Sequence, residues 1–203
     1  ADAILPARSS VSKNKGQESL IAVGASTGGT IALRELLIPL PEDMPGIVIV
    51  QHMPKAFTKS FSESLDKDCR LKVCEACEGE KVERGKVLVS PGDQHMMLKL
   101  DGKGYSVTMN NGDLVNRHRP SVDVLFRSVA NLAGSNSIGV ILTGMGDDGA
   151  RGIFEMHEAG SHTFAQDEES SVVYGMPRKA LESGGVDEVL NLEGISNRLI
   201  ELS

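Results

Sequence analysis

The sequence LIAVGASTGG at residues 20–29 joins an apolar run to a glycine-rich turn, and a helical pattern over residues 30–38 follows it. The run Leu20–Val23 is short and uniformly apolar, which is typical of a strand covered on both faces. Such strands occur in parallel sheets, because helices pack on both faces of those sheets. This stretch therefore predicts an α/β fold built on a parallel sheet.

The same alternation of strand and helix patterns continues along the chain. Apolar runs typical of strands lie at 47–50, 71–73, 87–89 and 138–142, and a further short strand begins at His162. Helical periodicity is present at 56–66, 121–133, 150–159 and 192–202. Ser121 is expected to cap the second of these helices and Gly160 to end the third.

One stretch interrupts the alternation. Residues 94–100 and 105–109 flank the sequence Asp-Gly-Lys-Gly at 101–104, which is typical of the turn in an antiparallel β-hairpin. The whole pattern predicts an α/β fold with an open, mostly parallel, doubly wound sheet that is flanked by helices and carries one antiparallel β-hairpin.

Composition and charge exclude several classes of protein. Hydrophobic residues make up 40% and charged residues 24% of the 203 residues, which is ordinary for a globular domain. The formal charge of −7, with only five Phe and two Tyr, argues against nucleic-acid binding, since that needs cationic groups and stacking platforms. No apolar run reaches the roughly 18 residues of a membrane span, and the first residues lack the apolar stretch of a signal peptide. We therefore expect a cytoplasmic protein with no direct membrane insertion.

The N-terminal residues and the cysteines bear on domain organisation. Residues 1–18 are polar and rich in Ser and Lys, so they are expected to be a linker remnant, with a single folded domain over 19–203. The rest of a longer protein would then lie on the N-terminal side. Cys69, Cys74 and Cys77 have the spacing of some iron–sulfur ligands but lack a fourth ligand, so reduced packing residues are expected.

Residues just after each apolar run are candidates for a functional site, because ligands of open α/β sheets bind beyond the carboxyl ends of the strands. The segment Gly24–Gly28 matches G-x-S-x-G in a strand-to-helix setting, where a serine projects its hydroxyl above the sheet edge. Ser26 is therefore a candidate nucleophile. Two alternatives stay open: a phosphate- or nucleotide-binding loop over Gly24–Gly29, although Thr30 stands where a P-loop needs Lys, and a purely structural turn.

His52 directly follows the second apolar run, at the same predicted sheet edge as Ser26. A neutral imidazole there can accept the serine proton and return it to a leaving group. A histidine in such a place is also commonly structural. His95, near the start of the hairpin, is a rival candidate, whereas His118 lies between two arginines whose positive charges disfavour an imidazolium.

The run at 138–142 leads into a glycine-rich loop that carries Asp147 and Asp148. A carboxylate in this place can hold an imidazole in the required tautomer and stabilise its charged form, which is the third role of a catalytic triad. An aspartate that only caps the next helix and a Mg²⁺ site are the other interpretations. The order Ser, His, Asp along the chain differs from that of α/β-hydrolases and of chymotrypsin.

These motifs resemble those of the CheB methylesterase family, the protein-glutamate methylesterases of bacterial chemotaxis. The resemblance covers about residues 18–203 and rests on five spaced motifs in one order: Gly24–Gly29, Val50–Pro54, Pro91–Met96, Arg119–Phe126 and Leu142–Gly149. It implies a serine hydrolase that demethylates glutamyl methyl esters on chemoreceptor helices, with release of methanol. It also implies that the enzyme deamidates certain receptor glutamines.

The resemblance further implies roles for single residues. Ser26 is then the nucleophile, His52 the general base and acid, and Asp148 the orienting carboxylate. No cofactor and no metal are expected. The oxyanion requires two donors, and the N–H groups of Met145 and Thr27 are the candidates.

By the same resemblance, the expected partners are the methylated cytoplasmic helices of chemoreceptors and an N-terminal receiver domain that this chain lacks. The chain is expected to be one catalytic methylesterase domain over residues 19–203 and to act as a monomer. Arg117, Arg119 and Arg151 are candidates to meet acidic receptor helices, with solvated surface charge as the alternative for each.

Overall fold

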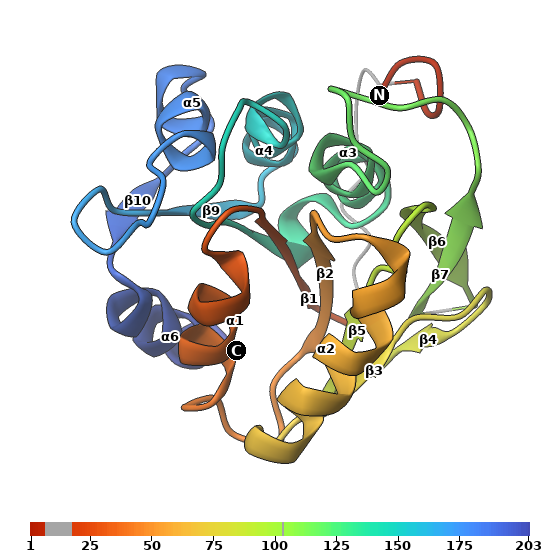
Figure 1. Cartoon of the computed structure of the whole chain (residues 1–203), viewed down its shortest axis with the longest axis horizontal. Coiled ribbons are helices and arrows are strands. Elements are labelled where there is room, and N and C mark those ends of the chain that lie inside the picture. Colours follow the sequence, from red (N-terminus) through yellow and green to blue (C-terminus); the bar gives the residue numbers. More distant parts are fainter. Residues whose placement is uncertain (7–17, 103) are drawn as a thin grey trace.

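The computed structural model describes residues 1–6, 18–102 and 104–203. Within these ranges the main sheet has seven strands in the order β10-β9-β8-β1-β2-β5-β3, and every neighbouring pair is parallel (Figure 1). The strands are β1 (Leu20–Ala25), β2 (Gly46–Gln51), β3 (Lys72–Glu75), β5 (Lys86–Val89), β8 (Ser137–Ile141), β9 (His162–Gln166) and β10 (Glu188–Leu190). The prediction of an open, mostly parallel sheet is confirmed.

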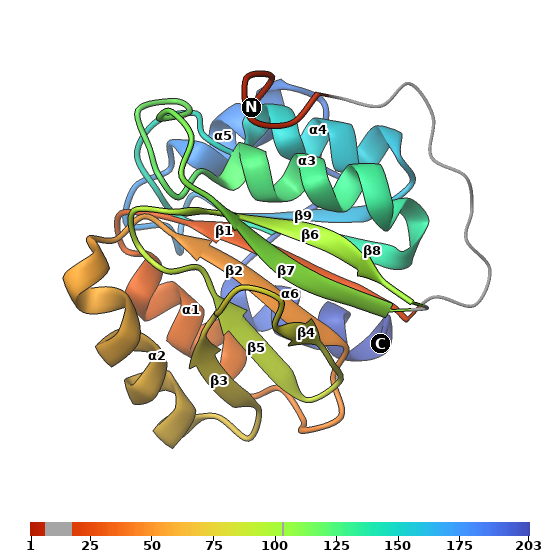
Figure 2. The ribbon, with the colours of Figure 1, turned by 90° about the vertical axis from the view of Figure 1, so that its right-hand side faces the viewer.

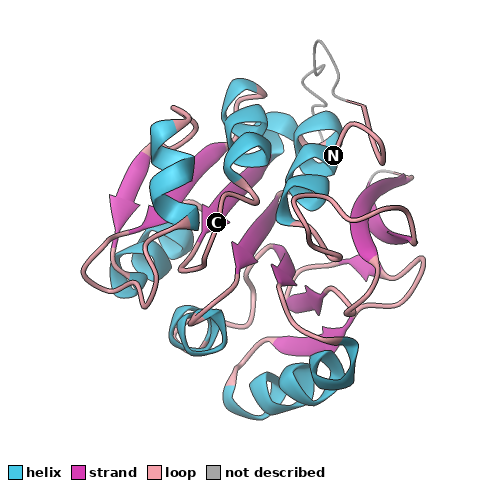
Figure 3. Cartoon of the chain, turned by 45° about the horizontal axis from the view of Figure 1, so that its top comes forward, coloured by secondary structure: helices cyan, strands magenta, loops and turns pink. Residues whose placement is uncertain are grey.

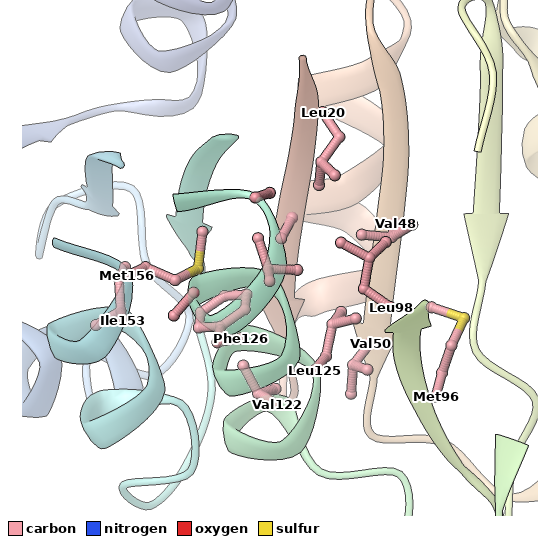
Figure 4. Close-up of a cluster of buried hydrophobic side chains, with 14 of the residues drawn as sticks. Leu20, Val48, Val50, Met96, Leu98, Val122, Leu125, Phe126, Ile153 and Met156 are labelled. Carbon is pink, nitrogen blue, oxygen red and sulfur yellow. The ribbon is translucent and has the colours of Figure 1, made fainter. Parts of the chain in front are cut away.

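The predicted hairpin is also present, and it belongs to a second, antiparallel sheet. β6 (His95–Asp101) pairs with β7 (Gly104–Asn110), and β4 (Lys81–Val82) completes the order β4-β7-β6. Met96 and Leu98, which are two residues apart and therefore on one face of β6, are buried against the same core as helix α3 (Val122–Leu132; Figure 4). The hairpin therefore contributes buried side chains to the hydrophobic core beside the main sheet.

Helices cover both faces of the main sheet, as a doubly wound fold requires (Figures 2 and 3). On one face lie α1 (Gly29–Leu37), α2 (Lys55–Asp68) and α6 (Leu192–Glu201), and on the other lie α3 (Val122–Leu132), α4 (Ala150–Glu158) and α5 (Met176–Glu182). The ranges expected for five of these helices agree with the structure to within two residues at each end. The short helix α5 has no counterpart in the sequence-based prediction.

The central strand β1 shows why its sequence is apolar throughout. Leu20 and Ala22 pack in one core cluster with α3 and α4, whereas Ile21 and Val23 pack in the other with α1 and α6. All four side chains are at most 1% exposed. Successive side chains of a strand point to opposite faces, so a strand with two covered faces has no position left for a polar residue.

The N-terminal residues 1–6 lie over α3 and α4 (Figure 2). Asp2 pairs with the guanidinium groups of Arg127 on α3 and Arg151 on α4. The expected linker over residues 1–18 falls mostly on residues 7–17, which lie outside the described part of the chain. No helix in the described ranges is long and apolar enough to cross a membrane.

Candidate active site

Three loops meet at the carboxyl edge of the sheet, where β8, β1 and β2 lie side by side. The ladder between β1 and β2 continues one residue past the strands, since the His52 N–H donates to the Ala25 carbonyl at 3.1 Å. On the other side of β1, the Ser26 N–H donates to the Thr143 carbonyl at 3.0 Å. The loops that carry the candidate serine, histidine and aspartates are thus held together by backbone hydrogen bonds.

Ser26 lies on a sharp strand-to-helix turn, in which three glycines have different roles. Gly28 has a φ of 82°, in the left-handed region where a side chain is strained. Gly24 lies in β1 so close to α3 that a Cβ would overlap Val122. The Gly29 N–H donates to the Ser26 carbonyl at 2.7 Å and closes the turn. Among the described residues, all hydrogen bonds of Ser26 are made by its backbone.

His52 and Asp148 are joined by a hydrogen bond. Nε2 of His52 lies 2.7 Å from Oδ2 of Asp148, and the two side chains are 7% and 1% exposed. Because an ionised carboxylate can only accept, Nε2 carries the proton and Nδ1 is the basic nitrogen. Nδ1 is buried and has no hydrogen-bond partner among the described residues. In chymotrypsin the ring has the opposite orientation, with Nδ1 bound to the aspartate.

Asp148 also caps the N-terminus of α3. Its carboxylate accepts from the backbone N–H groups of Val122 at 2.7 Å and Asp123 at 3.2 Å. Ser121 is the N-cap residue of this helix, as expected, but its hydroxyl makes no capping hydrogen bond and donates to Asp148 at 2.7 Å instead. Helix α4 starts after Gly149 with no side-chain cap, so neither aspartate caps the helix that follows it. The prediction that Gly160 ends α4 is confirmed, because Gly160 follows this helix with a φ of 92°.

The donors around Asp148 keep it ionised. Burial by itself raises the pKa of Asp148, but the hydrogen bonds from His52, Ser121 and Asn116 outweigh burial and hold that pKa below its ordinary value. Asn116 contributes through its side-chain amide, with Nδ2 2.9 Å from Oδ1. Asp147, by contrast, is exposed. Of the two neighbouring aspartates, only Asp148 contacts His52.

A second buried carboxylate, that of Asp123, lies beside Asp148. The amide Nδ2 of Asn116 bridges the two, at 2.6 Å from Asp123 and 2.9 Å from Asp148, and the Gly152 N–H donates to Asp123 at 2.6 Å. Burial, together with the negative charge of Asp148, raises the pKa of Asp123 to about 6. Sequence reasoning did not single out Asp123; the available signal was an aspartate among the apolar residues of a predicted helix.

This raised pKa makes stability depend on pH. Because folded Asp123 binds its proton more tightly than the unfolded chain does, it favours folding below about pH 4, and this contribution is lost as pH rises through about 6. Replacement by Asn removes the titration. We therefore expect the free energy of unfolding of Asp123→Asn, relative to wild type, to rise by about 1–3 kcal/mol between pH 4.5 and 7.5. Urea unfolding of both proteins across this range tests it, and a difference that is constant with pH would contradict it.

A tight turn over Val115–His118 also reaches the His52–Asp148 pair. Val115 and His118 exchange backbone hydrogen bonds of 3.0 and 2.9 Å, and the two central residues have positive φ, as in a type I′ turn. The His118 ring stacks on the His52 ring, with centroids 3.6 Å apart and planes inclined by 8°. The turn thus places the side-chain amide of Asn116 against Asp148 and the ring of His118 against His52.

The two remaining candidate histidines are accounted for by their surroundings. Burial is the main cause that lowers the pKa of His118, and the electrostatic interaction with His52 adds to it. The interaction with Arg117 also lowers this pKa, as predicted, but by less. His95 is fully buried, with Nε2 2.9 Å from the Asp113 carbonyl and Nδ1 accepting from the Ser121 N–H. Both nitrogens of His95 are therefore engaged, so it is a structural residue.

The candidate oxyanion donors lie in the loops after β1 and β8. Neither the Thr27 N–H nor the Met145 N–H makes a hydrogen bond to another described residue. The Met145 loop is braced, since the Gly144 N–H donates to the Val173 carbonyl at 3.0 Å and the Met176 N–H donates to the Gly144 carbonyl at 2.9 Å. Free N–H groups on a rigid loop are what the stabilisation of an oxyanion requires.

Cavities lie on two sides of these groups. One of about 320 Å³ is lined by His52, Met53, Pro54, Leu114, His118 and Pro120. Another of about 380 Å³ is lined by Met145, Gly146, Asp147, Val173, Tyr174 and Arg178. The first reaches the candidate base and the second reaches the candidate oxyanion loop, so a substrate has access to both.

The three candidate substrate-binding arginines differ in their surroundings. Arg119 pairs with Asp93 at 2.6 Å, and Arg151 pairs with Asp2 at 2.9 Å. Arg117 is exposed and has no ion pair with another described residue. Of the three guanidinium groups, that of Arg117 is therefore the one without an ion pair among the described residues. It lies at the tip of the turn beside His52.

The three cysteines are free thiols. Burial raises the pKa of Cys74 to about 11, so its thiol stays protonated. Within the described ranges no group of three or more His, Cys, Asp or Glu side chains is arranged to hold a metal ion.

Comparisons with known proteins agree on one family. The family model of the CheB methylesterase matches residues 21–199. The chain is 55% identical to the protein-glutamate methylesterase/protein-glutamine glutaminase 2 of Rhizobium johnstonii, covering 98% of this chain and 55% of the relative. It is 57% identical to the Pectobacterium atrosepticum protein of the corresponding name, covering 90% and 52%. The chain therefore spans about half the length of these curated relatives.

A solved structure gives the same result for the fold. The crystal structure of the Thermotoga maritima CheB methylesterase catalytic domain superposes with a TM-score of 0.90 at 40% sequence identity. The match covers 92% of this chain and 100% of that one. The family-model match over residues 21–199 includes Ser26, His52 and Asp148.

Proposed function

The chain belongs to the CheB methylesterase family, and from this premise we propose that it is a serine hydrolase that demethylates glutamyl methyl esters of bacterial chemoreceptors and deamidates certain receptor glutamines. The observation that carries the proposal is the buried hydrogen bond between His52 and Asp148 at the sheet edge next to Ser26. The printed names of the relatives support the same two activities.

In the proposed mechanism Ser26 is the nucleophile. Asp148, ionised and accepting the Nε2 proton, holds His52 in the tautomer whose lone pair is on Nδ1, so Nδ1 can take the Ser26 proton as Oγ attacks the ester carbonyl. The imidazolium formed in this step is stabilised by the buried carboxylate. The neutral ring of His118 covers one face of this imidazolium and shields it from water.

Attack places negative charge on the carbonyl oxygen, and the free N–H groups of Met145 and Thr27 are the proposed donors to it. Collapse of this intermediate breaks the bond to the methoxy group, and His52 returns the proton so that methanol leaves. Water, deprotonated by His52, then attacks the acyl-enzyme. The bond from the acyl carbon to Ser26 Oγ breaks, His52 returns the proton to Oγ, and the glutamate carboxyl is released. With a glutamine side chain the same steps release ammonia.

The surface around the site supports a macromolecular substrate. Among the described residues the five most exposed large apolar side chains, each between 58% and 66% exposed, are Ile31, Phe57, Leu114, Met145 and Val172. All five lie at helix starts or in loops on the carboxyl edge of the sheet. An apolar rim of this kind, with Arg117 beside it, suits the docking of an amphipathic, acidic helix.

The same proposal assigns partners and location. The methylated cytoplasmic helices of chemoreceptors are the substrate, which places the enzyme in the cytoplasm, and residues 19–203 form one catalytic domain that acts as a monomer. Because the chain spans about half of its curated relatives, we propose that the full-length protein adds an N-terminal receiver domain. Residues 1–18 would then form part of the linker to it.

Methanol release from membranes that bear methyl-labelled chemoreceptors tests the proposed function. Wild-type protein and Ser26→Ala are compared, and release by the wild type alone is the expected result. Binding of ATP, GTP or NAD in calorimetry, without methanol release, would favour a phosphate-binding loop over Gly24–Gly29 instead. Receptor binding that is unaffected by Ser26→Ala, again without methanol, would favour a module that only binds.

A further inference from the structure

Gln51 is a buried amide that the proposed chemistry does not use. It is the last residue of β2, directly before His52, and its side chain is 3% exposed. In the register of the sheet it lies opposite Ala25, the residue before Ser26. Gln51 thus lies between the two loops that carry the proposed nucleophile and the proposed base.

Both N–H bonds of the Gln51 amide are directed at backbone carbonyls of these loops. Nε2 lies 2.9 Å from the carbonyl oxygen of Ser26 and 3.1 Å from that of His52. The backbone ladder between β1 and β2 ends one step earlier, at the hydrogen bond from the His52 N–H to the Ala25 carbonyl. The Gln51 amide therefore extends the connection between the two strands past the point where the backbone ladder stops.

The orientation of the amide is fixed by its surroundings. Because both neighbours are carbonyl oxygens, only the NH₂ side of the amide can face them. Oε1 then points to Gly29, where a Cβ would overlap it, and it has no hydrogen-bond partner among the described residues. A Cβ at Gly29 would overlap both Gln51 and the side chain of Ala25, so this glycine is required by close packing and not by the backbone angles of the turn.

We propose that Gln51 is a positioning residue for the hydrolytic reaction, one that fixes the backbone of Ser26 relative to the backbone of His52. The proposal rests on the proposed function, because it assigns Ser26 and His52 their catalytic roles. The amide leaves its own Oε1 buried without a hydrogen-bond partner among the described residues, a cost that an apolar side chain of the same length would avoid. The two hydrogen bonds across the strand ends are what the amide provides and an apolar side chain lacks.

The test is Gln51→Met, which keeps the length and volume of the side chain but removes both donors. We expect kcat for methanol release to fall about 10- to 100-fold, since a shift of about 1 Å between reacting groups has an effect of this size. KM should stay within about twofold of wild type, because Gln51 is buried and does not touch substrate. The rate at which a fluorophosphonate labels Ser26 should fall by the same factor as kcat.

Ser196→Ala is the matched control. The buried Ser196 hydroxyl donates to the Leu36 carbonyl and so ties α6 to α1, far from the sheet edge. We expect this variant to lose some thermal stability, with kcat and the labelling rate unchanged. If Gln51→Met lowers the melting temperature but leaves kcat and the labelling rate at the wild-type values, Gln51 is merely structural and the proposal is overturned.

Labelling also separates this proposal from the proposed function. Wild-type protein that is labelled at Ser26 but releases no methanol overturns the assigned substrate, and the ratio of labelling rates still decides the role of Gln51. Wild-type protein that is not labelled at all overturns the serine mechanism and the role of Gln51 with it. A rise in KM with kcat unchanged in Gln51→Met overturns the positioning role, because it would mean that the amide acts in substrate binding.

Discussion

Ser26→Ala is expected to reduce methanol release by roughly 10³- to 10⁶-fold while the protein stays folded. The proposed hydrolysis requires an oxygen nucleophile at this position, and alanine has none. Stability should change little, because the hydrogen bonds of Ser26 among the described residues are all made by its backbone, which the substitution keeps. Single-turnover assays with methyl-labelled receptor, together with circular dichroism and urea unfolding, measure both quantities.

His52→Ala extends this test, because the two side chains act as one unit in the proposed mechanism. Each single variant should lose nearly all activity, and the double variant should be no worse than the worse single variant. Independent contributions would instead multiply, and such a result would exclude a shared proton transfer between Ser26 and His52. Full activity of a folded Ser26→Ala protein would exclude the serine mechanism altogether.

Asp148→Ala is expected to have the largest effect on stability of any substitution at the site. The carboxylate caps α3 and accepts from His52, Ser121 and Asn116, so its removal leaves several buried donors without an acceptor. We expect the free energy of unfolding to fall by about 3–5 kcal/mol, with methanol release lost as well.

Asp148→Asn separates the two roles of this residue. An asparagine keeps one acceptor but turns an NH₂ group towards donors, and it no longer holds His52 in the reactive tautomer. Activity should therefore fall by roughly 10⁴-fold, whereas the loss of stability should be smaller than in Asp148→Ala. Asp147→Asn is the matched control, because Asp147 is adjacent and exposed, and both activity and stability should stay near wild type. Equal effects at the two positions would contradict the assignment of Asp148.

The sequence was sufficient for the framework of the fold, because the framework depends on local patterns. The run Leu20–Val23 is apolar on both faces, and the structure buries it between two helical layers. The hairpin around residues 101–104 has a turn sequence that specifies it locally. By contrast, α5 has seven residues and β4 has two, so neither is long enough to show a period.

The site was only partly predictable, because its details depend on contacts between distant segments. The predicted strand ends pointed to Ser26, His52 and the pair Asp147 and Asp148, and the family resemblance selected Asp148 from that pair. It did not predict that Asp148 caps α3 or that His118 stacks on His52, because both contacts join residues that lie far apart in the sequence. The orientation of the His52 ring, that is, which ring nitrogen donates to Asp148, could not be predicted from the sequence either.

The ion pair between Asp2 and Arg127 affects where a recombinant fragment of this protein should begin. The Arg127 side chain is 0% exposed and is neutralised by Glu155 on α4 and by Asp2, which lies 125 residues away in sequence. The family match begins only at residue 21. A recombinant fragment designed to start there would leave a buried guanidinium with a single carboxylate, so fragments for crystallisation or calorimetry should retain the first six residues.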